Sequence, residues 1–247
     1  MWKRLVAAGV VVVVAAVPFA AATAGAATTS TTATTRDLTA VRHRCESKID
    51  VRLVELTKLD GRVAIAKNLT DGHRQAMTDI NSHARAGLTD LRAKIDQDDD
   101  PAVLKQDCQS IVVDYRIFAL RAPQEKLVIA SDAETSAVTK LEALEPTLQS
   151  AIDKAKAQGK DVTGAQQAFD DLTAKVADAA KQDDKVSDTV LGYTPADYDA
   201  NHDVLVPART AVKAAAGDLH AARRDAMAIA DDLRDQRAAT TTTTAAA

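Results

Sequence analysis

Apolar side chains recur every three or four positions along almost the whole chain after residue 36. The clearest stripe alternates steps of four and three residues, over Leu104, Cys108, Ile111, Tyr115, Phe118 and Ala122. A longer stripe of the same spacing runs from Ala208 to Leu233, with alanine at several of its positions. Such spacing places the apolar side chains on one face of a helix. It predicts helices over 36–68, 72–97, 101–122, 124–158, 163–190 and 195–237.

Capping residues and prolines set the expected ends of these helices. The segment Asp98–Pro101 combines acidic N-cap candidates with a first-turn proline, and Thr194–Asp197 has the same character and an early acid. Ser131 and Glu134 have the spacing of a capping box, which allows a new helix to start there. Pro123 predicts a break or a kink between the third and fourth helices.

The predicted fold class is all-α, built from long antiparallel helices. Because the connections are short, consecutive helices should lie side by side and run in opposite directions. We expect two tandem three-helix units, over 36–122 and 123–237, that form an elongated rod. The pattern equally allows one compact bundle folded back at Pro123.

Residues 1–26 have the order of a secretory signal peptide. Lys3 and Arg4 precede an apolar run that Pro18 interrupts, and small residues follow up to Ala26. We expect cleavage after Ala26 and export to the extracellular side or the cell envelope. The alternative is an uncleaved anchor, because the apolar segment approaches the ~20 residues that a spanning helix needs. After cleavage no membrane insertion is expected.

Both ends of the mature chain are of low complexity. Residues 27–35 are rich in threonine, and residues 238–247 contain only alanine and threonine. Neither segment has enough apolar surface to offset the entropy of ordering it, so we expect both to be disordered. Threonine runs of this kind also allow O-linked sugars in an exported chain.

The two cysteines, Cys45 and Cys108, predict a disulfide, because an even count in an exported chain usually forms bridges. Helical rise supports the pairing. The first helix climbs about 35 Å from Cys45, the second returns about 38 Å, and the third climbs about 10 Å before Cys108. The two thiols therefore end within about 10 Å of each other along the bundle axis.

Charge and composition argue against several classes of partner. The chain has 31 Lys and Arg against 35 Asp and Glu, and Lys3 and Arg4 leave with the leader. A mildly acidic chain lacks the excess of basic side chains that usually binds nucleic acids or anionic membranes. Aromatic residues make up 3% of the chain, which counts weakly against a surface for sugars or peptides.

The acidic run Asp96–Asp100 together with Asp107 is the one metal-like pattern. Counted as a calcium loop, acids stand at its first, third, fifth and twelfth positions. Position six requires glycine for a sharp turn, and Pro101 stands there with its φ locked negative. A capped helix start explains the same residues without a metal ion, and weak calcium binding is kept as an alternative.

No catalytic, cofactor-binding or metal-ligating residues are predicted. No pair of histidines has the i, i+4 spacing of a zinc site, and the chain contains no HExxH, GxSxG, P-loop or GxGxxG motif. Cys45 and Cys108 lack the CxxC spacing of redox enzymes. We therefore expect the histidines to be solvated or partly packed. They are His43, His73, His83, His202 and His220.

Several strings carry a resemblance: Lys48-Ile49-Asp50, Asp107-Cys108, Asp114-Tyr115-Arg116 and Thr194-Pro195-Ala196-Asp197-Tyr198. With the Ala-rich helices, they make the chain similar to secreted helical proteins of high-GC Gram-positive bacteria. That group has no established activity, so the resemblance implies export and a helical fold and transfers no functional residues.

The expected function is that of a secreted or cell-envelope helical protein that acts as a spacer or an interaction module, without catalysis. Its partner would be a protein or a component of the cell wall, and its oligomeric state is open. The alternative is a weak calcium-binding helical protein that uses Asp96–Asp107.

Overall fold

The computed structural model describes residues 28–245 of the chain, with side chains over 37–236, so the expected signal peptide at 1–26 lies outside the described residues. The described residues contain helices and no strand, which confirms the all-α class. The elements are α1 (Thr28–Ile65), α2 (Asp71–Gln97), α3 (Pro101–Val113), the π-helical turn η1 (Ile117–Arg121), α4 (Ala122–Ala157), α5 (Thr163–Asp183), α6 (Val186–Gly192), α7 (Pro195–Ala200) and α8 (Val206–Ala245).

Capping residues mark the helix starts at three places, and the sequence predicted the two at Asp100 and Thr194. The Thr70 hydroxyl accepts a hydrogen bond from the His73 backbone at 3.2 Å, and Asp100 caps α3 ahead of Pro101. Thr194 and Asp197 form a reciprocal capping box at α7. Each cap gives an otherwise unpaired amide of the first turn a partner, which explains why the helices begin there.

The third helix ends earlier than predicted, and Pro123 does not break the chain. α3 stops at Val113, and Arg116 adopts a left-handed conformation with φ of 43°. The Arg116 carbonyl then accepts from the amides of both Leu120 and Arg121, which opens the π-helical turn η1. Pro123 lies in the first turn of α4, where a missing N–H is tolerated. The guanidinium of Arg116 pairs with Asp199, a contact too distant in sequence for the helical pattern to reveal.

The last two predicted helices are each interrupted. The segment expected as 163–190 divides at Lys185, whose φ is 58°, into α5 and α6. The segment expected as 195–237 divides between Ala200 and Val206, where Asn201 accepts from the Asp203 amide in a turn and Pro207 opens α8. A buried glutamine of α4, Gln124, donates to the Val190 and Tyr193 carbonyls at 2.7 and 2.8 Å and so satisfies the end of α6.

The terminal helices are longer than predicted. α1 already includes residues 28–35, and α8 continues through 238–245, although we expected both segments to be disordered. Extending a formed helix adds one hydrogen bond for each residue ordered, so alanine and threonine can continue it where they could not begin it.

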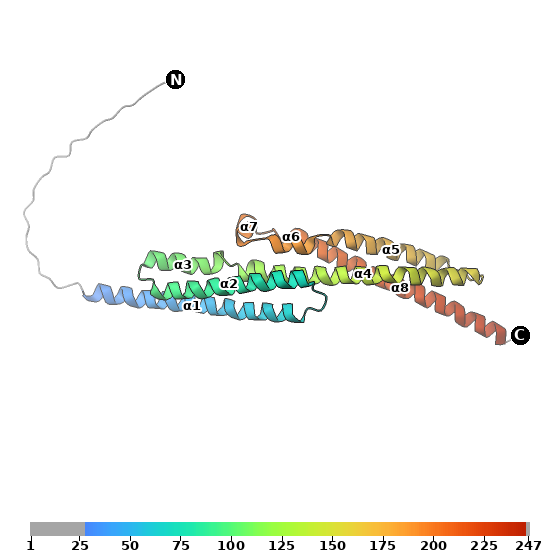
Figure 1. Cartoon of the computed structure of the whole chain (residues 1–247), viewed down its shortest axis with the longest axis horizontal. Helices are drawn as coiled ribbons and strands as arrows, with labels where there is room; N and C mark the ends of the chain where they lie inside the picture. Colours follow the sequence, from blue (N-terminus) through green and yellow to red (C-terminus); the bar gives the residue numbers. More distant parts are fainter. Residues whose placement is uncertain (1–27, 246–247) are drawn as a thin grey trace, which may run out of the picture.

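Within residues 37–236 the buried apolar side chains form three clusters in a row along the long axis of the molecule. The first lies among α1, α2 and α3, and the third among α4, α5 and α8. The middle cluster joins the end of α1 and the start of α2 to α4, α6 and α8. α4 contributes to all three clusters and so runs beside each of the other groups of helices in turn (Figure 1).

The disulfide is present between Cys45 and Cys108, with Cα atoms 5.5 Å apart. It links α1 to α3 inside the first cluster, as predicted from the helical rise. Both sulfurs are buried, and the bridge closes a loop of 63 residues.

Gly87 on α2 makes room for Tyr115. A Cβ at Gly87 would lie 3.0 Å from Tyr115 Cε1 and 3.1 Å from its Cζ, whereas a Cβ at Gly217 on α8 meets nothing within 4 Å. Gly217→Ala should stabilise the fold by about 0.5–1 kcal/mol, because alanine favours helix. Gly87→Ala should instead destabilise the fold by about 1–2 kcal/mol, because the ring of Tyr115 must move. Thermal unfolding of the two variants tests this, and equal gains in both would contradict it.

Candidate functional site

A group of polar side chains lies where α2 begins, beside the middle of α4 and the start of α6. A cavity of about 270 Å³ opens there, and we call it the junction cavity. Its lining includes the carboxylates of Asp132, Asp183 and Asp188 and the cationic side chains of His73 and Lys185. The hydroxyl groups that line it belong to Thr70, Ser131, Thr135, Ser136, Thr139 and Ser187.

His73 is held between two carboxylates on different helices. Its Nδ1 lies 2.8 Å from Asp132 Oδ1, and its Nε2 lies 3.1 Å from Asp188 Oδ1. Burial alone would lower the pKa of His73, but the hydrogen bonds and charges of Asp188 and Asp132 outweigh burial and raise that pKa. The contacts of His73 with the two carboxylates therefore stabilise the fold fully when the pH is below 6.5, the ordinary pKa of histidine. This stabilisation is lost as the pH rises through the raised pKa of His73.

Asp132 is the centre of the junction. Its carboxylate is 5% exposed and accepts from the Thr70 amide at 2.8 Å, the Ser187 hydroxyl at 2.9 Å and the His73 ring. The three donors come from the N-terminus of α2 and from α6, while Asp132 stands on α4. One buried carboxylate thus fixes three helices to one another, and its partners satisfy a charge that would be costly alone.

The order of these groups differs from that of a nucleophilic triad. In a triad the histidine contacts the serine and the acid orients the histidine. Here the Ser187 hydroxyl donates to Asp132, and the far nitrogen of His73 faces Asp188. Ser187 is buried, and its hydroxyl hydrogen-bonds a carboxylate and not the ring of His73. The junction therefore positions helices and lacks the arrangement that activates a nucleophile.

A second acidic pair lies beside the junction cavity, between the middle and third clusters. Asp183 accepts from the Thr135 hydroxyl at 2.9 Å through Oδ2, and burial raises the pKa of Asp183 although hydrogen bonds with Ser131 and Thr135 oppose this. Glu134, 9% exposed, has a buried Oε2 without a partner among the described residues. Burial and the charge of Asp183 raise the pKa of Glu134 to about 7. Buried carboxyl groups with strongly shifted pKa values are typical of functional sites.

Glu134→Gln should remove a pH dependence of stability. The pKa of Glu134 is 4.5 in an unconstrained chain and about 7 in the fold, so the folded state binds more protons between these values. Stability of the parent protein should therefore fall as pH rises from 4.5 to 7. Glu134→Gln should melt higher than the parent at pH 8, with the difference shrinking at pH 5. Glu142→Gln, on an exposed part of α4, is the control. An equal change of melting temperature with pH in both variants would contradict the raised pKa of Glu134.

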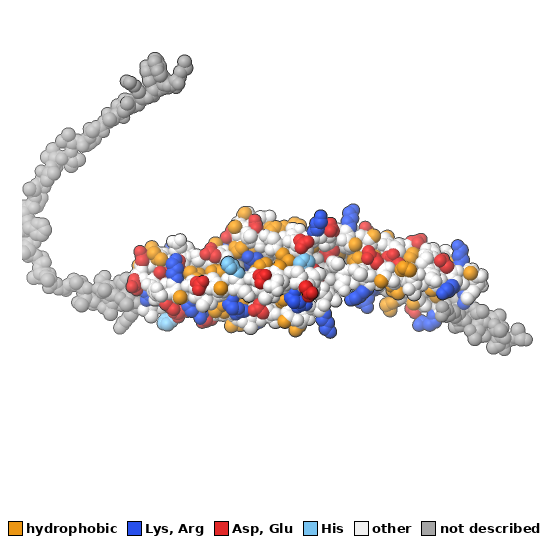
Figure 2. Space-filling view, viewed as in Figure 1, with side chains coloured by type: hydrophobic (Ala, Val, Ile, Leu, Met, Phe, Trp, Pro, Cys, Tyr) orange, Lys and Arg blue, Asp and Glu red, His pale blue; other side chains and the backbone are white. Residues whose placement is uncertain are grey.

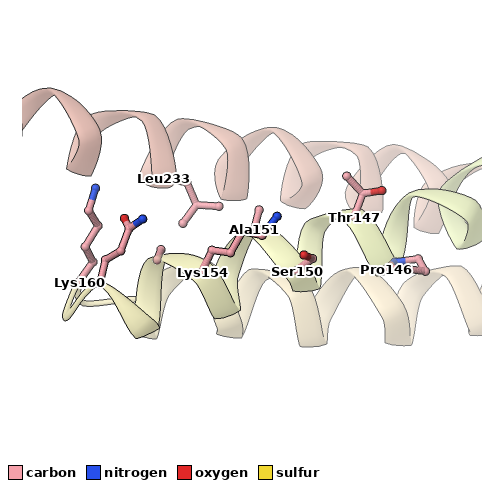
Figure 3. Close-up of a pocket in the computed structure, with 9 residues that line it drawn as sticks. Pro146, Thr147, Ser150, Ala151, Lys154, Lys160 and Leu233 are labelled. Carbon is pink, nitrogen blue, oxygen red and sulfur yellow. The ribbon is translucent and has the colours of Figure 1, made fainter.

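A wider groove of about 680 Å³ lies between the ends of α4 and α8. Figure 3 shows Leu233 of α8 extending toward α4, with Lys154 and Ser150 on the opposite wall and Lys160 at the end. Two lysines and no carboxylate line it, so it offers no acid–base pair.

Among the acids expected to form a calcium loop, the side chains of Asp98 and Asp107 lie within hydrogen-bond reach of each other, whereas others have separate partners. Asp99 pairs with Arg42 at 2.9 Å, Asp107 is buried and pairs with Lys94 at 2.9 Å, and Asp100 caps α3. Among the described residues no group of three or more histidine, cysteine, aspartate or glutamate side chains is placed to hold a metal ion. The geometry therefore gives the calcium alternative no support.

The sequence patterns did not predict the junction residues. His73 was expected to be solvated or partly packed, and Ser131 with Glu134 resembled a capping box, yet both lie inside α4 and are buried. The available signal was that Ser131 and Glu134 occupy seam positions of the apolar stripe that continues to Val138 and Leu141. Polar groups on a buried seam require partners from other helices.

Comparison with protein-family models, with curated proteins and with solved structures finds no match for this chain. Among the residues that the structure describes, no helix combines the length and apolar character that crossing a bilayer requires.

Proposed function

We propose that the protein is a secreted or cell-envelope helical protein that acts as a spacer or interaction module, without catalytic activity. The observation that carries the proposal is the use of the junction residues: His73 of α2 and Ser187 of α6 both bind Asp132 of α4. Their arrangement fixes helices along the length of the molecule and leaves no activated nucleophile.

The outer face of α1 supports an interaction role. Val51, Val54 and Ile65 lie on the side of α1 that faces away from the core, and each is more than half exposed. A helix whose second face also carries apolar side chains is typical of one that packs against a partner. On the face shown in Figure 2, acidic and basic side chains alternate, which agrees with protein contact rather than binding to a polyanion.

Location outside the cytoplasm is part of the proposal, and the buried Cys45–Cys108 bridge supports it, because disulfides persist in oxidising compartments. Non-reduced protein recovered from the medium of the producing cells should have a mass that begins at Ala27 and is two hydrogens lighter than the dithiol. Protein that keeps residues 1–26 and stays with the membrane would contradict export as a cleaved chain.

The interaction role is tested with a photo-crosslinking residue in place of Val54, in the cells that make the protein. We expect one discrete adduct in the envelope fraction, which the same residue at Asp171, exposed on α5, does not give. The absence of any adduct from Val54, or the same adducts from both positions, would contradict a partner at α1.

A further inference from the structure

We propose that the groove between α1 and α3 binds an acidic amphipathic helix of a partner protein, whose carboxylates pair with a row of cations on α1. The inference rests on the proposed interaction role and deepens it. It concerns a different surface from that of Val54, so binding at this groove and crosslinking at Val54 can fail independently of each other.

The α1–α3 groove has a volume of about 450 Å³ and a largely apolar lining. Leu38 and Val41 of α1 are half-buried and Pro101 of α3 is exposed, so apolar surface remains accessible on both helices. The Cys45–Cys108 bridge also lines the groove and holds the two helices beside each other. An apolar groove of this kind is a typical docking surface for the apolar face of another helix.

Basic side chains flank the α1–α3 groove. Arg44 and Lys48 line it from α1, and Arg52 continues the row by one turn, with its guanidinium 5.6 Å from the centre of the Phe118 ring. The three cations follow one another every four residues, which is about 6 Å along the helix axis. Lys105 lines the groove from α3. None of these four cations forms a salt bridge with a described residue.

This row of cations is unfavourable in the protein alone. Like charges four residues apart on a helix repel each other, so each neighbouring pair in the row destabilises α1. Asp37 is the only acid among the described residues that line the groove. Burial lowers the pKa of Arg52, and no carboxylate of a described residue counteracts this. Carboxylates supplied by a partner would remove the repulsion, so charge complementarity selects an acidic partner.

The spacing of the cations selects a helix over a small amphiphile. Glutamates at every fourth residue of a helix are also about 6 Å apart along its axis. Three such glutamates can therefore pair with Arg44, Lys48 and Arg52 together, while leucines beside them enter the groove. A fatty acid has one carboxylate and would leave most of the row unpaired.

The test is titration of the full mature chain with a labelled synthetic helical peptide of about 20 residues, followed by fluorescence anisotropy. The peptide has leucines at heptad spacing and, beside them, three glutamates four residues apart. A matched peptide has glutamine in place of these glutamates. We expect saturable binding of the acidic peptide and at least tenfold weaker binding of the glutamine peptide.

Two variants of the chain make the same change in net charge at different places. Lys48→Glu should weaken binding of the acidic peptide at least tenfold, whereas Lys140→Glu, exposed on α4, should leave it unchanged. Lys48→Glu should remain folded, because a glutamate there lies one turn from both Arg44 and Arg52 and can pair with them. Circular dichroism checks that both variants keep their helices.

No saturable binding of the acidic peptide, equal binding of the two peptides, or full binding by Lys48→Glu would each overturn the proposal. Laurate serves as the single-headed competitor. If laurate displaces the peptide from the parent chain and itself binds saturably, the groove belongs to a fatty acid, which also overturns the proposal.

Discussion

Removal of the Cys45–Cys108 bridge is expected to lower the melting temperature by about 10 °C. In the chain-entropy model, a closed loop of 63 residues stabilises a fold by about 4 kcal/mol. For a chain of this size each kcal/mol corresponds to about 2–4 °C. The bridge closes the end of the molecule where α3 is short and has few other contacts to α1, so its loss should free α3 first.

The measurement is thermal unfolding of the parent and of a Cys45→Ala/Cys108→Ala variant, each with and without reductant. Alanine is used because both positions are buried and a serine hydroxyl would lack a partner there. Reductant should lower the melting temperature of the parent and leave that of the variant unchanged. A parent chain that melts at one temperature in both conditions would show that the bridge carries no stability.

Asp132→Ala should destabilise the fold by about 3–5 kcal/mol, because it removes one partner of a buried charged network and leaves the others unsatisfied. The Thr70 amide, the Ser187 hydroxyl and one nitrogen of His73 all lose their acceptor. The pKa of His73 should fall from its raised value, because burial lowers it and only Asp188 would remain to oppose burial.

Asp188→Ala is the matched control, because this carboxylate contacts the same histidine but is 76% exposed. An exposed ion pair contributes about 0–1 kcal/mol. Melting curves of both variants and an NMR titration of the His73 ring give the comparison. If the two variants lose similar stability, Asp132 does not hold the three helices together.

Helix positions could be predicted because helix formation depends on local spacing and caps. Asp100 and the Thr194–Asp197 box mark real helix starts, and their capping contacts are with residues close in sequence. The disulfide followed as well, since helical rise converts residue counts into axial distance. The left-handed residues Arg116 and Lys185 were not foreseen, because long-range contacts decide where a continuous apolar stripe is interrupted.

The sequence by itself determined an all-α chain, the approximate helices and the pairing of Cys45 with Cys108. Periodicity, capping chemistry and axial rise are properties of single helices and their nearest neighbours. Only the tertiary structure decided that His73, Asp132 and Ser187 meet, and that the buried Glu134 feels the charge of Asp183. The first three lie 55 or more residues apart where they pair, and no local pattern encodes which turns of α2, α4 and α6 come into contact.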